Sequence, residues 1–251
     1  AMPSVIPSDD WERWVGKVDV VFPDEPWKLK WDFLLMVAIV YSCVTVPFRL
    51  GMAYPAEGNW WLFEVSITGF FIADLWLTFR VAAANGPNEL LVERTLISKR
   101  YWEFWLWVDA SSSFPVELVE VIFNLIGRDG NDSNLRLLKL LRALRLLRLL
   151  RLLKVLKLNA IMQVVEMRLA FPIQYLQLTK MLAGDLYLMH IFGCGWYYLH
   201  LMEVETASTE GREPTTWLTE YMDGSRMDAS KWEHYLSCIY WALMTLTTVG
   251  Y

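Results

Sequence analysis

The stretch from residue 135 to 158 constrains this chain most, because it places a basic residue at every third position with almost only leucine between. The basic residues are Arg136, Lys139, Arg142, Arg145, Arg148, Arg151, Lys154 and Lys157. An α-helix has about 3.6 residues per turn, so this period would wind the charges around it as a spiral stripe, whereas a 3₁₀-helix would align them. Either geometry puts a column of cations, here called the ladder, into a strongly apolar helix.

The composition indicates a membrane protein. Of the 251 residues, 55% are hydrophobic and 14 are tryptophan, and the mean hydropathy is +0.27, which exceeds that of an ordinary soluble domain. The cysteines Cys43, Cys194 and Cys238 lie in or beside apolar segments, without the spacing of a disulfide framework or a zinc site. No signal-peptide pattern opens the chain, so residues 1–30 are expected to be a cytosolic N-terminal segment.

Long apolar segments predict an all-α membrane fold, because about 20 apolar residues cross the hydrocarbon core as a helix. The candidate spanning helices are residues 31–53, 60–84, 101–123 with a kink or an end near Pro115, the ladder at 135–158, and 173–202. Residues 232–246 are apolar but too short to cross, which indicates a re-entrant helix.

Several acids lie within the candidate spanning helices, and three of them are candidate partners of the ladder. An isolated carboxylate is costly in a membrane, so we expect the ladder to supply partners for Glu64, Asp74 and Asp109. Phe71, one turn before Asp74, is expected to form a hydrophobic partition that the cations cross one at a time. Asp32 is expected either to pair with the inner end of the ladder or to cap the first helix. Each charge that crosses the membrane field is worth about 2.3 kcal/mol per 100 mV, so several would make a conformational equilibrium steeply voltage dependent.

Other readings of the ladder are a basic helix on a membrane surface, a calmodulin target and a nucleic-acid-binding arm. The three preceding apolar spans with buried acids, and the unbroken period of three, argue against all of these, so no nucleic-acid partner is expected. His190, His200 and His234 are isolated and favour packing over chemistry. The chain has no glycine-rich phosphate loop, nucleophile elbow or zinc motif, and it is not expected to be an enzyme.

The final stretch, "YWALMTLTTVGY", predicts an ion site. Thr248, Val249, Gly250 and Tyr251 fit a turn of extended backbone whose carbonyls replace the hydration shell of K⁺. Gly250 permits the left-handed torsions that such a column needs. The same residues would also suit an ordinary strand, but here they follow a short apolar helix, which favours a filter.

Several segments together resemble the transmembrane part of voltage-gated-type cation channels, in the superfamily of ether-à-go-go, hyperpolarisation-activated and cyclic-nucleotide-gated channels. "KLKWDFLLMVAIVY", "FFIADLWLTFR" and "WVDASSSFPVEL" resemble its first three helices, and "HIFGCGWYYL" and "YWALMTLTTVGY" resemble its fifth helix, pore helix and filter. The likeness covers roughly residues 27–251. The filter departs from the Cys-Ile-Gly of hyperpolarisation-activated and the Ile-Gly-Glu of animal cyclic-nucleotide-gated relatives, which favours K⁺ over a nonselective pore.

The resemblance implies roles for these residues. Arg136 to Lys157 would be gating charges, the acids Glu64, Asp74 and Asp109 their countercharges, and the Thr248 hydroxyl with the carbonyls of residues 248–251 would line the filter. The implied organisation is a cytosolic segment at 1–30, a voltage-sensor domain at 31–158, a connector at 159–172 and a partial pore domain at 173–251, truncated at the filter.

The resemblance also implies partners and alternatives. It implies a homotetramer in the lipid bilayer of the plasma membrane, K⁺ as the permeant ion, and modulation by a downstream cyclic-nucleotide-binding domain whose site is outside this chain. One alternative is a cyclic-nucleotide-gated channel with a nearly static sensor, and another is a voltage sensor that controls a transporter or an enzyme. The sequence leaves open the sign of voltage gating and whether Asn131, in a glycosylation triplet, is modified.

Overall fold

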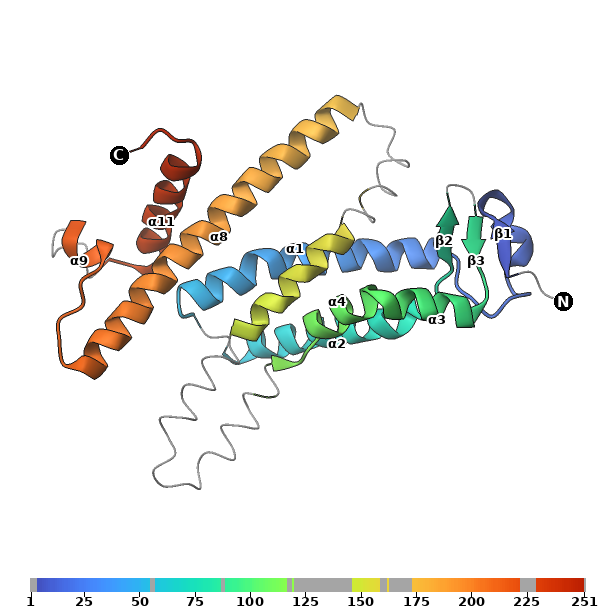
Figure 1. Ribbon diagram of the computed structural model, residues 1–251, viewed down its shortest axis with the longest axis horizontal. Helices are drawn as coiled ribbons and strands as arrows, with labels where there is room; N and C mark the ends of the chain where they lie inside the picture. Colours follow the sequence, from blue (N-terminus) through green and yellow to red (C-terminus); the bar gives the residue numbers. More distant parts are fainter. Residues whose placement is uncertain are drawn as a thin grey trace, which may run out of the picture. The chain divides into compact units, whose positions relative to one another are not determined.

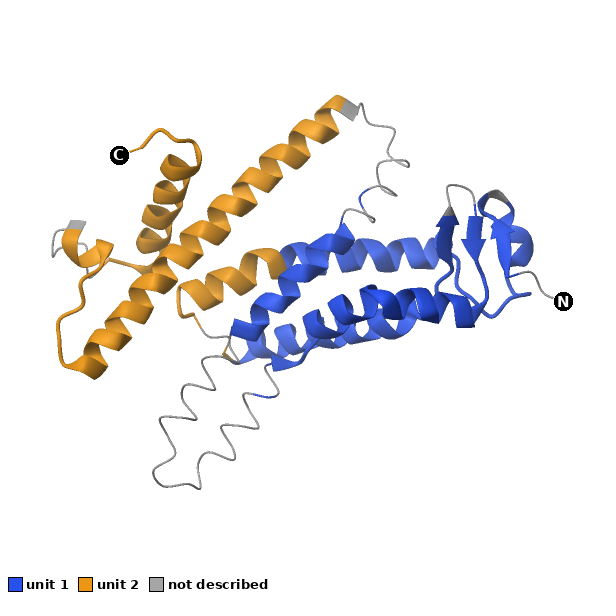
Figure 2. Ribbon diagram, in the orientation of Figure 1, with its two compact units in different colours: residues 1–41, 58–167 blue, residues 42–57, 168–251 orange. Residues whose placement is uncertain are grey.

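The computed structural model describes residues 4–54, 57–86, 89–116, 119, 146–158, 162, 173–221 and 229–250, and these are mostly helical (Figure 1). The chain divides into two compact units (Figure 2). Unit 1 comprises residues 1–41 and 58–167, and unit 2 comprises residues 42–57 and 168–251. The boundary between them falls within a continuous helix, α1 (Pro26–Gly51), which contributes residues to both units.

Two of the described helices, α1 and α2 (Asn59–Thr78), are long and apolar enough to cross a membrane. Pro26 suits the first position of α1, where a missing backbone N–H costs nothing. The sequence predicts a second helix that continues to residue 84, but α2 ends at Thr78. It ends there because the chain turns into an extended segment, in which Ala82 donates its backbone N–H to the Val21 carbonyl at 2.9 Å.

A small antiparallel sheet closes one end of unit 1. Its strands are β1 (Val5–Pro7), β2 (Ala83–Gly86) and β3 (Glu89–Leu91), in the order β1-β3-β2. The 3₁₀-helix η1 (Ser8–Trp14) follows β1. The buried core beneath this sheet is formed by Ile6, Phe22, Ala82, Leu90 and Val92. The sequence reading does not anticipate this sheet, which ties the N-terminal segment to the linker after α2.

The third predicted span, residues 101–123, is divided differently in the structure. Helix α3 (Arg94–Glu103) and helix α4 (Trp105–Ser112) are separated at Phe104, whose backbone has φ −148° and ψ −51°. Helix α4 ends before Pro115, as expected where a proline disfavours helical geometry in the residue that precedes it. Within the described residues, the break in this segment therefore lies at Phe104 as well as near the proline.

The described part of the ladder forms a 3₁₀-helix, η3 (Leu147–Lys154), which packs against α4. Residues 155–158 continue it as α-helix. Of the two geometries that the sequence allows, the structure therefore has the one that places every third residue on one line.

Unit 2 is built on α8 (Ile173–Glu210), against which α11 (Lys231–Leu246) packs, with the short α9 (Trp217–Tyr221) between them in sequence. Helix α8 extends beyond the predicted residue 202, and α11 matches the predicted re-entrant segment to within one residue. The Ser230 hydroxyl caps α11 by accepting the Glu233 backbone N–H at 3.3 Å. A Cβ at Gly193 of α8 would lie 3.0 Å from the end of the Ile239 side chain, so the absence of a side chain here lets the two helices pack closely.

Candidate functional site

The ladder brings buried cations into unit 1. Arg151 and Lys154 are only 4% and 1% exposed, and both lie on η3. Because a 3₁₀-helix has three residues per turn, Arg148, Arg151 and Lys154 share one face of η3. The other sequence-predicted ladder residues, Arg136, Lys139, Arg142 and Arg145, lie outside the described residues.

Lys157 joins two buried acids. Its Nζ lies 3.1 Å from Asp74 Oδ2 and 2.5 Å from Asp109 Oδ2. Asp74 is on α2 and Asp109 on α4, and they are 2% and 0% exposed. Removing one partner of a buried ion pair is costly, so these three residues form one unit that none of them can leave without cost.

Lys154 lies on the face of an aromatic ring. Its Nζ is 4.1 Å from the centroid of Phe71, and both side chains are buried. Among the described residues this ammonium has no hydrogen-bond partner. The negative face of the ring attracts a cation at this distance, and the attraction grows when water is excluded. Phe71 lies one turn before Asp74 on α2, so successive ladder lysines occupy successive positions along that helix.

A threonine that the sequence reading missed contacts the next ladder residue. Arg151 Nη2 donates to Thr68 Oγ1 at 3.0 Å, and Thr68 donates to the Glu64 backbone carbonyl at 3.0 Å. Glu64, Thr68, Phe71 and Asp74 recur at helical spacing and are all buried, so α2 presents them on one face. This spacing in the sequence could have indicated that Thr68 faces the ladder.

Asp74 and Asp109 each accept a hydrogen bond from a neutral side chain outside the ladder. The sequence analysis did not predict these two donors. Trp31 Nε1 donates to Asp74 Oδ1 at 3.1 Å, which leaves Oδ2 for Lys157. The Tyr101 hydroxyl donates to Asp109 Oδ2. Both acids are therefore oriented by a partner outside the ladder, one from α1 and one from α3.

Asp32 lines the same cavity as the ladder residue Lys157. It pairs with Lys28, one turn earlier on α1, and Lys28 is itself buried. Because α1 begins at Pro26, Asp32 lies within the helix and does not cap its N-terminus. Glu64 is buried on the same face of α2 as Asp74.

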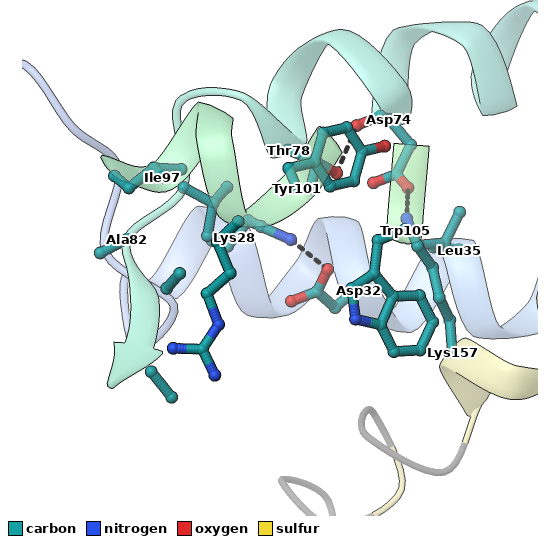
Figure 3. A pocket seen from close by; sticks show the side chains of 14 residues that line it. Lys28, Asp32, Leu35, Asp74, Thr78, Ala82, Ile97, Tyr101, Trp105 and Lys157 are labelled. Atoms are coloured by element: carbon teal, nitrogen blue, oxygen red, sulfur yellow. Dashed lines mark hydrogen bonds and ion pairs between the residues drawn. The ribbon is translucent and has the colours of Figure 1, made fainter. Parts of the chain in front are cut away.

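A cavity of about 390 Å³ lies beside these acids in unit 1 (Figure 3). Lys28, Asp32, Asp74, Tyr101 and Lys157 contribute its polar lining, and the Lys28–Asp32 and Lys157–Asp74 pairs are both visible there. A polar cavity of this size accommodates several water molecules. Of the two acids that hold Lys157, Asp74 therefore lies at the wall of a cavity wide enough for water.

The predicted filter residues follow the end of α11. Thr248 and Gly250 have φ of +57° and +79°, in the left-handed region that glycine tolerates and a β-branched residue rarely adopts. The Gly250 N–H donates to the Met244 carbonyl at 3.3 Å, which keeps this turn against the helix end. Val249 is exposed in this single chain, and Tyr251 lies outside the described residues.

Comparison with known proteins finds matches along most of the chain. The family described as "Ion transport protein" matches residues 27–251. Potassium channel KAT1 of Oryza sativa subsp. japonica is 28% identical over 233 residues, which are 92% of this chain and 30% of that protein. Potassium channel KAT1 of Arabidopsis thaliana is 27% identical over 233 residues, 92% of this chain and 32% of that protein. Potassium channel AKT1 of Oryza sativa subsp. japonica is 27% identical over 222 residues, 88% of this chain and 21% of that protein. The chain thus spans about a third or less of the length of these curated relatives.

Proposed function

Because the chain belongs to the ion transport protein family, we propose that it is the transmembrane part of a voltage-dependent, potassium-selective channel subunit. The observation that carries this proposal is the buried contact of Lys157 with Asp74 and Asp109. A ladder of cations that pairs with acids inside an apolar bundle is expected of an element that moves in the membrane field. The names of the similar potassium channels and the Thr-Val-Gly-Tyr filter sequence support K⁺ as the permeant ion.

The proposal assigns a role to each part of the chain. Residues 31–158 form the voltage sensor, residues 159–172 the connector, and residues 173–251 a partial pore domain, with residues 1–30 in the cytosol. Four copies surround one pore in the plasma membrane, so that the carbonyls of residues 248–251 face its axis. A cyclic nucleotide would act through a domain outside this chain.

The sensor works by exchanging cations at fixed acids. Three residues of 3₁₀-helix rise about 6 Å, so one step of the ladder replaces Lys157 by Lys154 between Asp74 and Asp109. The same step brings Arg151 to the Phe71 ring. Since Trp31 and Tyr101 stay with the acids, each arriving cation finds both carboxylates already oriented. Each elementary charge that crosses the field contributes about 2.3 kcal/mol per 100 mV.

The first experiment is a patch-clamp recording of the full-length protein that contains this chain. Voltage steps in both directions, under K⁺ and then Na⁺ gradients, are expected to give a steeply voltage-dependent K⁺ current. The same steps with intracellular cyclic nucleotide distinguish a voltage-driven channel from a ligand-driven channel with a static sensor. A voltage-insensitive current, or one that Na⁺ carries equally well, would contradict the proposal.

Substitutions in the ladder and in the filter test the two assigned roles independently. Lys154→Gln removes a buried cation and is expected to reduce the measured gating charge per channel, while Lys30→Gln, which removes an exposed cation of α1, leaves it unchanged. Gly250→Val is expected to abolish K⁺ current and keep the gating charge, because valine resists the φ of +79° at this position. Unaltered K⁺ selectivity in Gly250→Val would exclude the filter assignment.

A further inference from the structure

A buried histidine links three helices within unit 2. His190 of α8 is 7% exposed, and its Nε2 lies 2.8 Å from the Val44 backbone carbonyl of α1. Its Nδ1 lies 2.8 Å from the Tyr235 hydroxyl of α11. The His190 and Tyr235 rings also meet edge to face, with centroids 5.9 Å apart. Both ring nitrogens are therefore occupied, one by each neighbouring helix.

The chemistry of the partners fixes the direction of each hydrogen bond. A backbone carbonyl only accepts, so Nε2 must carry the proton and donate to Val44. In the neutral ring Nδ1 is then an acceptor, and the Tyr235 hydroxyl donates to it. The bridge thus runs from the Tyr235 hydroxyl through the imidazole to the Val44 carbonyl, in one tautomer.

The packing around this bridge leaves little room for substitutes. A Cβ at Gly51 of α1 would lie 2.5 Å from the Cys194 carbonyl, one turn after His190 on α8. On the other side, Tyr235 meets the Phe48 ring edge to face at 5.1 Å. Because the helix backbones are already this close, a water molecule cannot easily take the place of the imidazole.

We propose that His190 is a positioning residue for the selectivity filter, which holds the first turns of α11 against the C-terminal part of α1. This inference rests on the proposed function as a K⁺ channel. Tyr235 lies near the start of α11, and the left-handed turn at Thr248 and Gly250 lies at its end. A helix moves as a rigid rod over this length, so a shift at its first turn displaces the carbonyls that follow it. A functional constellation tolerates displacements of only about 0.5 Å.

Substitutions of the bridge residues test the inference in the full-length channel. His190→Leu removes the hydrogen bonds to the Val44 carbonyl and to the Tyr235 hydroxyl, and Tyr235→Phe removes one of the two. Both are expected to accelerate the decay of K⁺ current during sustained opening severalfold and to lower the K⁺ over Na⁺ permeability ratio. His190→Gln is expected to behave as wild type, because its amide can donate to Val44 and accept from Tyr235.

The controls separate a filter effect from a folding defect. Tyr240→Phe, on the exposed side of the same helix α11, is expected to leave the current unchanged. Raising external K⁺ is expected to slow the decay in His190→Leu, since an ion that binds the intact filter stabilises that state by mass action. The inference would be overturned if the K⁺ current of Tyr235→Phe decayed at the wild-type rate. It would also be overturned if His190→Gln accelerated the decay as much as His190→Leu does.

The tautomer gives a second test that does not depend on conduction. The full-length protein is labelled with ¹⁵N-histidine and its nitrogen NMR spectrum is recorded in bilayers. The signal of His190 is identified as the one that disappears in His190→Gln, and it is expected to show a protonated Nε2 and an unprotonated Nδ1. The opposite tautomer would overturn the bridge. If the wild-type protein conducts no K⁺, both the proposed function and the filter role of His190 are contradicted. If the wild-type channel is K⁺-selective and the variants behave like it, only the role of His190 is contradicted.

Discussion

The two units bury polar groups of different kinds. Among the described residues of unit 1, two buried acids, Asp74 and Asp109, are in direct contact with one cation, Lys157. The described part of unit 2 instead buries neutral groups, such as His190, His200 and Cys238. Charges pair with any partner of opposite sign, whereas neutral hydrogen bonds depend on direction and on a particular donor. The proposed function requires an element that exchanges partners in unit 1 and a support that keeps one arrangement in unit 2.

The largest effect is expected from Asp109→Ala, because it leaves Lys157 and the Tyr101 hydroxyl short of a buried partner. Breaking one member of a buried ionic group costs about 3–5 kcal/mol, so the thermal unfolding midpoint of the purified full-length protein should fall by several degrees. Adding Lys157→Gln is expected to restore part of the loss, because the uncompensated cation disappears. Strictly additive losses in the double variant would show that the two residues are not coupled.

A smaller effect is expected from Phe71→Leu, which keeps the partition apolar but removes the ring face from Lys154. A desolvated cation–π contact is worth about 2 kcal/mol, and the half-activation voltage should shift accordingly. Phe71→Trp retains a ring face and should stay near wild type. An equal shift in both variants would mean that size at this position matters and the ring does not.

Unit 2 offers a neutral counterpart with a smaller effect. His200 Nδ1 lies 2.8 Å from Thr216 Oγ1, and Thr216 also contacts Thr219, so Thr216 keeps a partner when the imidazole is lost. We therefore expect His200→Phe to cost about 1 kcal/mol of unfolding free energy, measured by the same thermal assay. A loss as large as that of Asp109→Ala would break the comparison between charged and neutral interiors.

The smallest effect is expected from Arg212→Gln beyond the end of α8. Arg212 pairs with Glu203 and Glu210 at the exposed surface, where water and salt screen the charges. The hydrogen bond from Arg212 lowers the pKa of the Glu203 carboxyl below its ordinary value. The contribution of this pair is therefore present above the ordinary pKa and is lost as pH falls through the lowered one. Current–voltage curves of Arg212→Gln should match wild type at neutral pH, and any difference in thermal stability should vanish in acid.

The apolar segments of the sequence predict the long helices because a run of about 20 apolar residues has few other stable environments. Helices α2 and α8 begin within one residue of the predicted positions, and α1 begins five residues before its predicted start. The break at Phe104 carries no proline or glycine, so nothing local announces it. The sheet strands are only three or four residues long, and β1 pairs with β3 from a distant part of the chain, which periodicity does not report.

The charged part of the candidate site was easier to anticipate than the neutral part. Buried acids require partners, so the sequence alone directs attention to Asp74 and Asp109 and to the ladder. Trp31, Thr68 and Tyr101 do not require burial or pairing, and their proximity depends on how α1, α2 and α3 are rotated about their axes. The voltage-sensing and filter roles of these residues stay predictions until currents are recorded.

The sheet order β1-β3-β2 has a practical consequence for trimming this chain. The family match starts at residue 27, yet β1 and Phe22 precede it. A chain shortened to that boundary would turn β3 from a central strand into an edge with unpaired backbone groups, and would empty the space that Phe22 fills. Edges of this kind recruit other chains, so the shortened protein should aggregate where the longer one stays dispersed. The family match and the folded unit thus begin at different residues.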